Sequence, residues 1–480
     1  MRVLEGLQPS NVLYYFEEIC SIPHISFHEK ALSDYCVKFA KEHDLFCQQD
    51  EMGNVLIVAE ATPGYEEVEP IILQGHLDMV GDKVPECPID MVNESIQIKV
   101  EGDYICAEGT TLGGDDGIAV AYGLAALASE DLPHPRLEVV LTVSEEVGLL
   151  GAAAMDLSAC KGRRLLNIDS EDEGVLTVSC AGGIHVESEI PVTRKAMTGI
   201  CCRVAFDGLR GGHSGVEIDK GRGNANVLLG RFLMILKEKT QYGLVKLSGG
   251  VKDNVIPKDA CAEFVTEDMT ALEQALEIFH EQLRAEYGAA EPDAKLVMTK
   301  SEQCEVMALD QDSLECVIEA LNLMPNGVQA MSMDIEGLVE TSLNMGTAEL
   351  TEDMLKLGFS IRSSVPSAKD QIVKKVEMLT KLLGGTTAST GAYPAWPYMR
   401  DSKLRELCIK IYKEQYGEEP QVQAIHAGLE CGLLSGKIPG LDCVSIGPDM
   451  KDIHSPKEML SISSVARVWE YVKAIISAKE

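Results

Sequence analysis

Four groups of polar side chains that could bind a metal ion or transfer a proton stand directly after short apolar runs. The runs IILQ, LEVVLTVS, LLNI and CVSIGP are followed by Gly75–Asp78, Glu145–Glu146, Asp169 and Asp449–His454. Open α/β sheets bind their ligands just beyond the carboxyl ends of their strands. If the apolar runs are strands, these polar residues are the first candidates for a functional site.

A fifth group, in the stretch LGGDDGIAVAYGLAAL, places Asp115 and Asp116 immediately before an apolar helical run. A carboxylate there meets the partial positive charge of a helix start, and an ordinary N-cap accounts for one such residue. The second carboxylate is then available to bind a cation.

Two pairs of these residues could divide the chemistry between them. His76 and Asp78 are two residues apart, so in extended backbone both side chains lie on one face and the carboxylate can orient the imidazole. Glu145 and Glu146 are adjacent and point differently in extended chain, so one can ligate a metal while the other handles a proton. Neighbouring glutamates are also common on solvated surfaces, and that alternative stays open.

Together the candidates supply two imidazoles and three carboxylates, a mixed nitrogen and oxygen set that suits Zn²⁺, Co²⁺ or Mn²⁺. A pair of such ions about 3.5–4 Å apart needs one bridging carboxylate. Asp115, anchored at a helix start, is the natural bridge. The expected ligands of two divalent ions, zinc first, are His76, Asp115, Glu146, Asp169 and His454.

The elements that must position these residues indicate an α/β fold with a mostly parallel sheet, interrupted by an inserted α+β domain. Helical segments alternate with the apolar runs Val55–Ala59, Ile71–Gln74, Leu137–Val143 and Leu165–Ile168, which are typical of strands covered on both faces. Over residues 186–388 the sequence pattern changes to that of an α+β region. A coarse repeat within this region allows an internal duplication. We therefore expect a first domain formed by residues 1–185 and 389–480, with residues 186–388 inserted.

The composition excludes some partners without identifying any. The 480 residues include 42 Lys and Arg against 76 Asp and Glu, a formal net charge of -34 that repels nucleic-acid backbones and anionic membranes. The first residues do not resemble a signal peptide, and fifteen cysteines without one favour a reducing compartment. We expect a cytoplasmic protein in which the adjacent Cys201 and Cys202 are small buried hydrophobes.

The motifs GHLDMV, LGGDDGIA, SEEVGLLGA, NIDSE and DIHSPKE resemble, in order and spacing, the five metal-site motifs of the M20 metallopeptidases. SIPHISFHEKAL and HAGLECGLL make the resemblance strongest to the aminoacyl-histidine dipeptidases, also called cytosolic nonspecific dipeptidases. The resemblance covers nearly the whole chain. It implies a zinc-binding α/β domain interrupted by a lid domain.

The same resemblance implies an activity and a role for each metal-site residue. One ion would take His76, Asp115 and Asp169, and the other Asp115, Glu146 and His454. Asp78 would orient the first site, and Glu145 would be the general base. The implied reaction is hydrolysis of small dipeptides with a free amino terminus, including Xaa-His substrates such as β-Ala-His, by a homodimer.

Five further residues are expected at the substrate by resemblance. His213 in GLRGGHSG would stabilise the developing oxyanion, and Asn254 and Arg362 would grip the substrate carboxylate. His426 and Glu430, in IHAGLECG, would face the amino end of the peptide from the returning α/β domain.

Two other interpretations compete with the dipeptidase. A related tripeptidase, carboxypeptidase or N-acyl amino acid deacylase would use similar metal motifs with different lid contacts. A metal-binding or peptide-binding protein without catalytic activity would have the same fold and use it for assembly or regulation.

Overall fold

The computed structural model describes residues 2–479, and its chain divides into two compact units. The first unit contains Met1–Ser179, Tyr398–Ala424 and Leu429–Glu480, and the second contains Cys180–Pro397 and Ile425–Gly428. The expected insertion boundaries at 186 and 388 fall inside two strands of the second unit, Gly182–Pro191 and Thr386–Tyr393. The change in sequence pattern therefore does not coincide with the ends of these strands.

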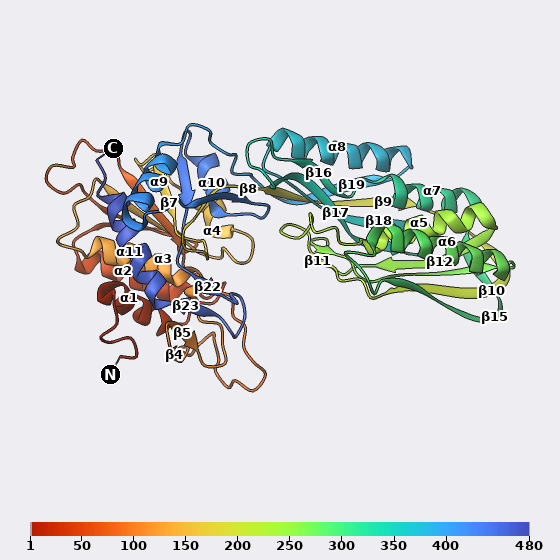
Figure 1. The fold of residues 1–480 in the computed structure, drawn as a ribbon, viewed down its shortest axis with the longest axis horizontal. Coiled ribbons are helices and arrows are strands. Elements are labelled where there is room, and N and C mark those ends of the chain that lie inside the picture. Colours follow the sequence, from red (N-terminus) through yellow and green to blue (C-terminus); the bar gives the residue numbers. More distant parts are fainter. Residues whose placement is uncertain (1, 480) are drawn as a thin grey trace. The chain divides into compact units, whose positions relative to one another are not determined.

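The first unit is built on a mixed eight-stranded sheet among the described residues (Figure 1). Its strands, in spatial order, are β1 (Phe46–Gln49), β2 (Val55–Ala59), β6 (Leu137–Thr142), β3 (Ile71–His76), β7 (Arg164–Asn167), β21 (Asp442–Ser445), β8 (Val175–Cys180) and β20 (Gln421–Ile425). The four central strands β6, β3, β7 and β21 pair in parallel, and their neighbours β2 and β8 pair with β6 and β21 in antiparallel fashion, as β1 does with β2. The expected α/β class is confirmed, with less parallel pairing than expected.

Seven helices accompany this sheet in the described part of the first unit. They are α1 (Ser10–Cys20), α2 (Lys30–Glu42), α3 (Gly114–Leu127), α4 (Leu150–Ala154), α9 (Lys403–Tyr416), α10 (Glu430–Lys437) and α11 (Ile462–Ile476). A smaller sheet has the order β22 (Met450–Lys451), β23 (Met459–Ser461), β5 (Tyr104–Ala107) and β4 (Ile98–Glu101).

The apolar composition of the central elements explains their position. Every residue of β2, β3 and β6 is buried, as expected for strands covered on both faces. Helix α3 is buried along its whole length, and its Tyr122 stacks on Trp469 of α11 with ring centroids 5.7 Å apart. The Tyr122 hydroxyl also donates to the Val465 carbonyl, which fixes the helix against α11.

The second unit holds a nine-stranded sheet among the residues described. Its path is β15 (Lys295–Leu309), β10 (Arg194–Asp207), β14 (Ala260–Thr266), β12 (Tyr242–Gly249), β17 (Val339–Leu350), β18 (Met354–Ser363), β9 (Gly182–Pro191) and β19 (Thr386–Tyr393), with β16 (Gly327–Met331) paired to β17. A separate pair joins β11 (Gly212–His213) to β13 (Val255–Ile256).

Four helices run alongside this second sheet in Figure 1 and share one hydrophobic core with it. They are α5 (Ala225–Lys239), α6 (Met269–Tyr287), α7 (Gln311–Leu323) and α8 (Pro366–Leu382). Helix α5 begins after Asn224, whose side chain caps it by accepting the backbone N–H groups of Asn226 and Val227.

One cysteine interpretation is wrong. Cys201 of β10 forms a disulfide with Cys304 of β15, with 6.3 Å between the Cα atoms. The two strands pair in antiparallel register with an irregularity at this position, so residues 103 apart in sequence face each other. Cys202 is buried as expected.

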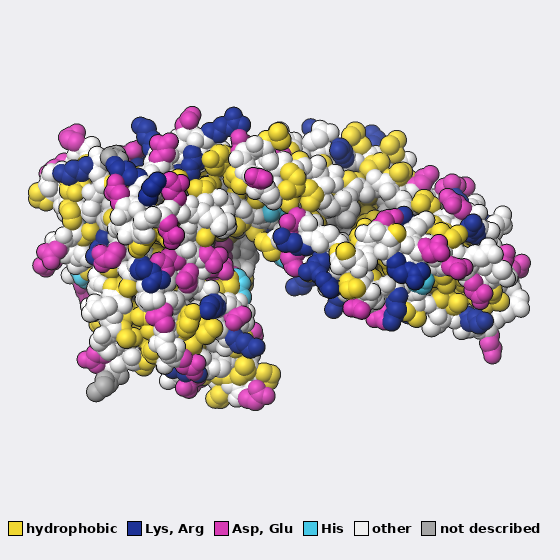
Figure 2. Space-filling model, viewed as in Figure 1, with side chains coloured by type: hydrophobic (Ala, Val, Ile, Leu, Met, Phe, Trp, Pro, Cys, Tyr) yellow, Lys and Arg dark blue, Asp and Glu magenta, His cyan; other side chains and the backbone are white. Residues whose placement is uncertain are grey.

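The face drawn in Figure 2 carries no region of a single charge sign that covers either unit. On the side drawn in Figure 2, acidic side chains are spread over both units among basic and hydrophobic ones. No helix within residues 2–479 has the length and apolarity required to cross a membrane.

Candidate metal centre

Asp115 lies between two imidazoles and presents a different oxygen to each. Its Oδ1 is 3.1 Å from His76 Nε2, and its Oδ2 is 3.1 Å from His454 Nε2. His76 ends β3, whereas His454 lies in the loop between β22 and β23. One carboxylate thus joins residues from two distant parts of the first unit, as a bridging ligand must.

The other two expected ligands lie beside the same imidazoles. Asp169 Oδ1 is 3.8 Å from His76 Nε2, and Glu146 Oε1 is 2.8 Å from His454 Nε2. Ligand atoms of Asp115, Glu146 and His454 all lie within 4.8 Å of one another. All five expected ligands therefore meet at the carboxyl ends of the central strands.

Two more carboxylates complete the cluster. Asp116 groups with His76 and Asp169, and Glu145 groups with His76 and Glu146, within the same 4.8 Å limit. The cluster is thus richer in carboxylates than the five-residue set expected from sequence.

The His76 imidazole is oriented by Asp78, mainly through the backbone. His76 Nδ1 is 2.9 Å from the Asp78 carbonyl oxygen and 3.4 Å from the Asp78 Oδ1 atom. A proton on Nδ1 satisfies these acceptors and leaves the Nε2 lone pair facing Asp115 and Asp169.

The Asp78 carboxylate instead holds the loop that follows β6. It accepts the backbone N–H groups of Glu145 and Glu146 at 2.8 and 3.2 Å, and the Ser26 hydroxyl at 2.8 Å. Glu145 and Glu146 lie in this turn rather than in extended chain, because β6 ends at Thr142. The turn still directs Glu146 to His454 while Glu145 stays near His76.

Asp115 and Asp116 stand at the start of α3, and neither is an ordinary N-cap. Both have non-helical backbone angles, and the peptide bond between them is cis. Asp116 Oδ2 accepts the backbone N–H of His76 at 3.1 Å, and its Oδ1 is buried without a hydrogen-bond partner. This approach requires glycine at position 75, where a Cβ would lie 2.5 Å from Asp116 Oδ2.

The electrostatics of this cluster favour a bound cation. Burial, followed by the charges of Glu430 and Glu146, raises the pKa of Glu145 to about 8. Hydrogen bonds to Asp115 and Glu146 raise the pKa of His454 to about 10. In the metal-free chain, protons therefore compensate the crowded carboxylates. Divalent ions would replace those protons, and the donor set together with the unpartnered Asp116 oxygen fits them.

The second unit gathers four of the residues expected at the substrate. His213 Nδ1 accepts the backbone N–H groups of Gly215 and Val216, each at 3.2 Å, so the neutral imidazole carries its proton on Nε2. The Ser214 N–H donates to the Asn254 carbonyl at 3.0 Å, which places Asn254 beside this turn.

Arg362 influences both histidines of this group. Burial and then the Arg362 charge lower the pKa of His213, and they lower that of His426 to about 4. The Arg362 guanidinium donates to the Tyr393 hydroxyl at 2.8 Å. His426 Nε2 lies 2.7 Å from the Ser342 hydroxyl, and residues 425–428 belong to the second unit rather than to the returning α/β domain.

Glu430 differs from the expectation that it faces a peptide. It starts α10 with an exposure of 0%, and its Oε2 accepts from Gln74 Nε2 and, at 2.6 Å, from the Thr142 hydroxyl. Burial raises its pKa to about 7. Its two donors belong to β3 and β6, so the carboxylate lies against the central sheet.

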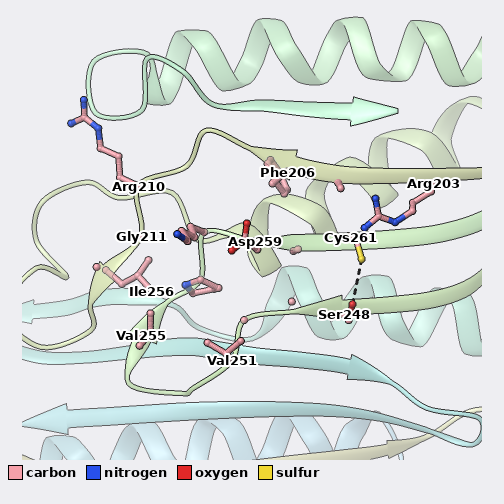
Figure 3. A pocket seen from close by; sticks show the side chains of 17 residues that line it. Arg203, Phe206, Arg210, Gly211, Ser248, Val251, Val255, Ile256, Asp259 and Cys261 are labelled. Carbon is pink, nitrogen blue, oxygen red and sulfur yellow. Dashed lines mark hydrogen bonds between the residues drawn. The ribbon is translucent and has the colours of Figure 1, made fainter. Parts of the chain in front are cut away.

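A pocket of about 520 Å³ lies within the second unit and holds none of the expected ligands (Figure 3). Gly211 and Gly212 on its wall directly precede His213, and Val255 follows Asn254. Figure 3 shows Arg203 and Arg210 at opposite ends of this pocket, with Asp259 between them.

Three side chains that contact the site residues or their loops were not predicted from the sequence. Ser26 donates to Asp78, and Glu29 Oε1 accepts the Ser144 N–H at 3.0 Å and its hydroxyl at 2.8 Å. Glu458 accepts backbone N–H groups before Asp115. The acidic residues in SIPHISFHEKAL and DIHSPKE were the available signal, because charged side chains amid apolar segments need partners.

A family model described as "Peptidase family M20/M25/M40" matches residues 72–478. The chain belongs to this family. Its M20 membership confirms that it is a metallopeptidase, as the five motifs indicated.

Relatives of this M20 chain extend over its whole length. It is 38% identical over 480 residues to the "Cytosol non-specific dipeptidase" of Escherichia coli, covering 99% of both chains. The aminoacylhistidine dipeptidase structure from Vibrio alginolyticus shares 37% identity with a TM-score of 0.94, covering 99% of this chain and 98% of that one. The aminopeptidase PepT structure from Bacillus cereus, at 16% identity and a TM-score of 0.58 over 98% of both chains, shares the fold.

Proposed function

We propose that this M20 peptidase hydrolyses dipeptides with a free amino terminus, Xaa-His substrates such as β-Ala-His among them, with the help of two divalent metal ions. The observation that carries the proposal is the position of Asp115, whose two oxygens each lie 3.1 Å from a different imidazole. The names of two full-length relatives, both dipeptidases, support the substrate class.

One ion would be held by His76, Asp115 and Asp169, and the other by Asp115, Glu146 and His454. Asp115 is preferred to Asp116 as the bridge because both of its oxygens face an imidazole Nε2. One Asp116 oxygen is already used to accept the His76 backbone N–H. Zinc is the first choice of metal, because imidazole and carboxylate ligands suit it, and cobalt or manganese fit the same set.

Ions bound there supply Lewis-acid chemistry, which lowers the pKa of a water molecule and polarises the peptide carbonyl. A Glu145 carboxylate oxygen takes the proton from the attacking water and delivers it to the leaving amine nitrogen. Asp78 keeps Glu145 in place through its backbone N–H. No residue of the chain has to form a covalent bond with the substrate.

The second unit would supply the substrate contacts. His213 carries its proton on Nε2 and can donate it to the developing oxyanion. Arg362 and Asn254 would bind the substrate carboxylate, for which a planar guanidinium is well suited. His426 lies in the same group, whereas Glu430 is fully buried and is left out of the proposed contacts.

We place the protein in the cytoplasm and expect a homodimer. The name of the Escherichia coli relative supports the compartment, whereas the Cys201–Cys304 disulfide weighs against it. Thiol counting on freshly isolated protein decides the point: fifteen free thiols support a reducing compartment and thirteen contradict it. Light scattering on the eluting protein tests the dimer.

Product analysis tests the proposed substrate class. The purified, metal-loaded protein should split β-Ala-His and Gly-Gly type dipeptides and leave tripeptides and N-acetylated amino acids largely intact. Equally fast release of the first residue from tripeptides would favour a tripeptidase, and hydrolysis of acylated substrates would favour a deacylase. No turnover of any of them would favour the non-catalytic binding protein.

A further inference from the structure

Glu458 is a buried carboxylate that binds the backbone directly before the proposed bridging ligand. Its exposure is 4%. Oε2 accepts the N–H groups of Leu112 at 2.7 Å and Gly113 at 3.1 Å, while Oε1 accepts that of Gly114 at 2.7 Å and lies 3.4 Å from that of Asp115. Four consecutive N–H groups therefore converge on one side chain.

The local backbone is shaped for this carboxylate. Gly113 has φ 72° and ψ 32°, a left-handed conformation that turns successive N–H groups toward one point. A Cβ at Gly114 would lie 3.1 Å from Glu458 Oε1, so the missing side chain leaves room for the contact. The LGGDD stretch thus forms an anion-binding turn that an internal carboxylate fills.

Glu458 also belongs to the loop that carries His454. Its own N–H donates to the Ser455 carbonyl at 3.1 Å, and the next residue begins β23, which pairs with β5. His454 lies four residues earlier with φ 57°, so the loop must hold it in a strained backbone conformation. Glu458 therefore connects the His454 loop to the backbone of the Asp115 turn.

We propose that Glu458 is a positioning residue for the metal centre: it fixes the distance between Asp115 and His454, two ligands of one proposed ion. Its carboxylate accepts hydrogen bonds from backbone N–H groups, so it acts through those ligands. Burial raises the Glu458 pKa, while the Gly113 and Leu112 N–H groups oppose that shift. Both oxygens face donors, so an amide at this position must turn its NH₂ group toward N–H groups.

This inference rests on the proposed two-metal function, and wild-type binding of two Zn²⁺ ions tests that function separately. The variants are Glu458→Gln and, as a matched control, Glu138→Gln. Glu138 is also fully buried and accepts the backbone N–H groups of Lys161 and Gly162, but it lies at the opposite end of β6 from the metal centre.

The measurements are Zn²⁺ affinity by competition with a chromogenic chelator, the visible spectrum of the Co²⁺-loaded protein, and the melting temperature. Glu458→Gln should weaken one of the two ions by about 10- to 100-fold and alter the Co²⁺ spectrum, because such changes follow loss of a group that orients ligands. Glu138→Gln should lower the melting temperature while leaving both metal affinities and the spectrum unchanged.

The proposal would be overturned if both variants lowered the melting temperature equally while each kept the wild-type affinity for both ions. If Glu458→Gln does not fold, the Gly114→Ala variant is measured in its place. Its added methyl group lies 3.1 Å from Glu458 Oε1 and should displace the carboxylate by a few tenths of an ångström. A smaller loss of affinity in the same direction supports the positioning role, and unchanged affinity and spectrum contradict it.

Discussion

The Asp78 carboxylate accepts the backbone N–H of Glu145, with 2.8 Å between Oδ1 and N. Because Asp78 follows β3 and Glu145 follows β6, this bond ties together the ends of two neighbouring parallel strands. It also places the proposed general base beside the proposed metal ligand His76.

Asp78→Asn should weaken metal binding and slow turnover together. The amide must present its NH₂ group to one of the donors, Ser26 or the two backbone N–H groups, so the Glu145 loop loses an acceptor. We expect a loss of about 10- to 100-fold in metal affinity. Chelator competition and kcat measure it, with the exposed Asp82→Asn as control; equal values for the two variants would refute this role.

Glu145→Gln should separate metal binding from catalysis. The amide cannot take a proton, so kcat should fall by about 10²- to 10⁴-fold while both ions remain bound. Its neighbour provides the comparison, because Glu146→Gln removes a proposed ligand 2.8 Å from His454 and should lose metal as well. If Glu145→Gln turned over substrate at the wild-type rate, another group would have to be the base.

Metal removal should make stability fall with rising pH. The ordinary pKa of Glu145 is 4.5 and its folded value is about 8, so within this window the metal-free folded chain keeps a proton that the unfolded chain has lost. His454 acts in the same direction: its folded pKa is about 10, so the stability it contributes is lost as pH rises through that value. Bound metal replaces these protons.

The measurement is the melting temperature between pH 5 and pH 9, with metal and with chelator. The difference between the two curves should widen as pH rises, because metal binding releases protons from its ligands. A constant difference over that range would show that these groups do not titrate in the metal-free chain.

Several elements and sites were predictable because local pattern determines them. The strand Val55–Ala59 has the predicted limits, since it is uniformly apolar and every residue in it is buried. Four of the five expected ligands follow an apolar strand or stand at the start of a buried helix, whereas His454 lies in the loop between β22 and β23. The convergence of these four follows from the sheet geometry, because the carboxyl ends of neighbouring parallel strands lie at one edge.

Contacts between distant segments could not be predicted in the same way. Glu458 is bound by backbone N–H groups more than 300 positions earlier, and main-chain donors leave no mark in the sequence. Cys201 meets Cys304 because the register between β10 and β15 shifts between Ile200 and Cys202. The burial of Glu430 depends on Gln74 and Thr142 from two other strands.

Glu430→Gln should stabilise the metal-free protein at pH 8 and change little at pH 5. Its folded pKa is about 7, so at pH 8 the wild-type chain carries a buried charge without a cation, whereas the amide oxygen still accepts from Gln74 and Thr142. Glu430→Ala should instead cost about 1–3 kcal/mol, because both donors lose their acceptor. Urea unfolding at the two pH values measures the stability of both variants. If Glu430→Gln raised KM, Glu430 would have to contact the substrate after all.

Arg362→Lys should raise KM for dipeptides by about tenfold or more while metal content stays unchanged. Lysine lacks the planar fork that binds a carboxylate, and it also changes the 2.8 Å contact with the Tyr393 hydroxyl. Arg203→Lys, on the wall of the separate pocket, is the matched control and should behave like wild type. If Arg362→Lys lowered kcat without raising KM, Arg362 would act in the chemical step and not in substrate binding.

Stepwise metal reconstitution tests the central claim most directly. Chelator-treated wild-type protein is titrated with Zn²⁺ or Co²⁺ while bound metal and dipeptide hydrolysis are followed on the same samples. The proposed centre around Asp115 predicts two ions per chain at saturation, with full activity only when both are bound. Full activity with one ion, or in protein shown to contain none, would contradict it.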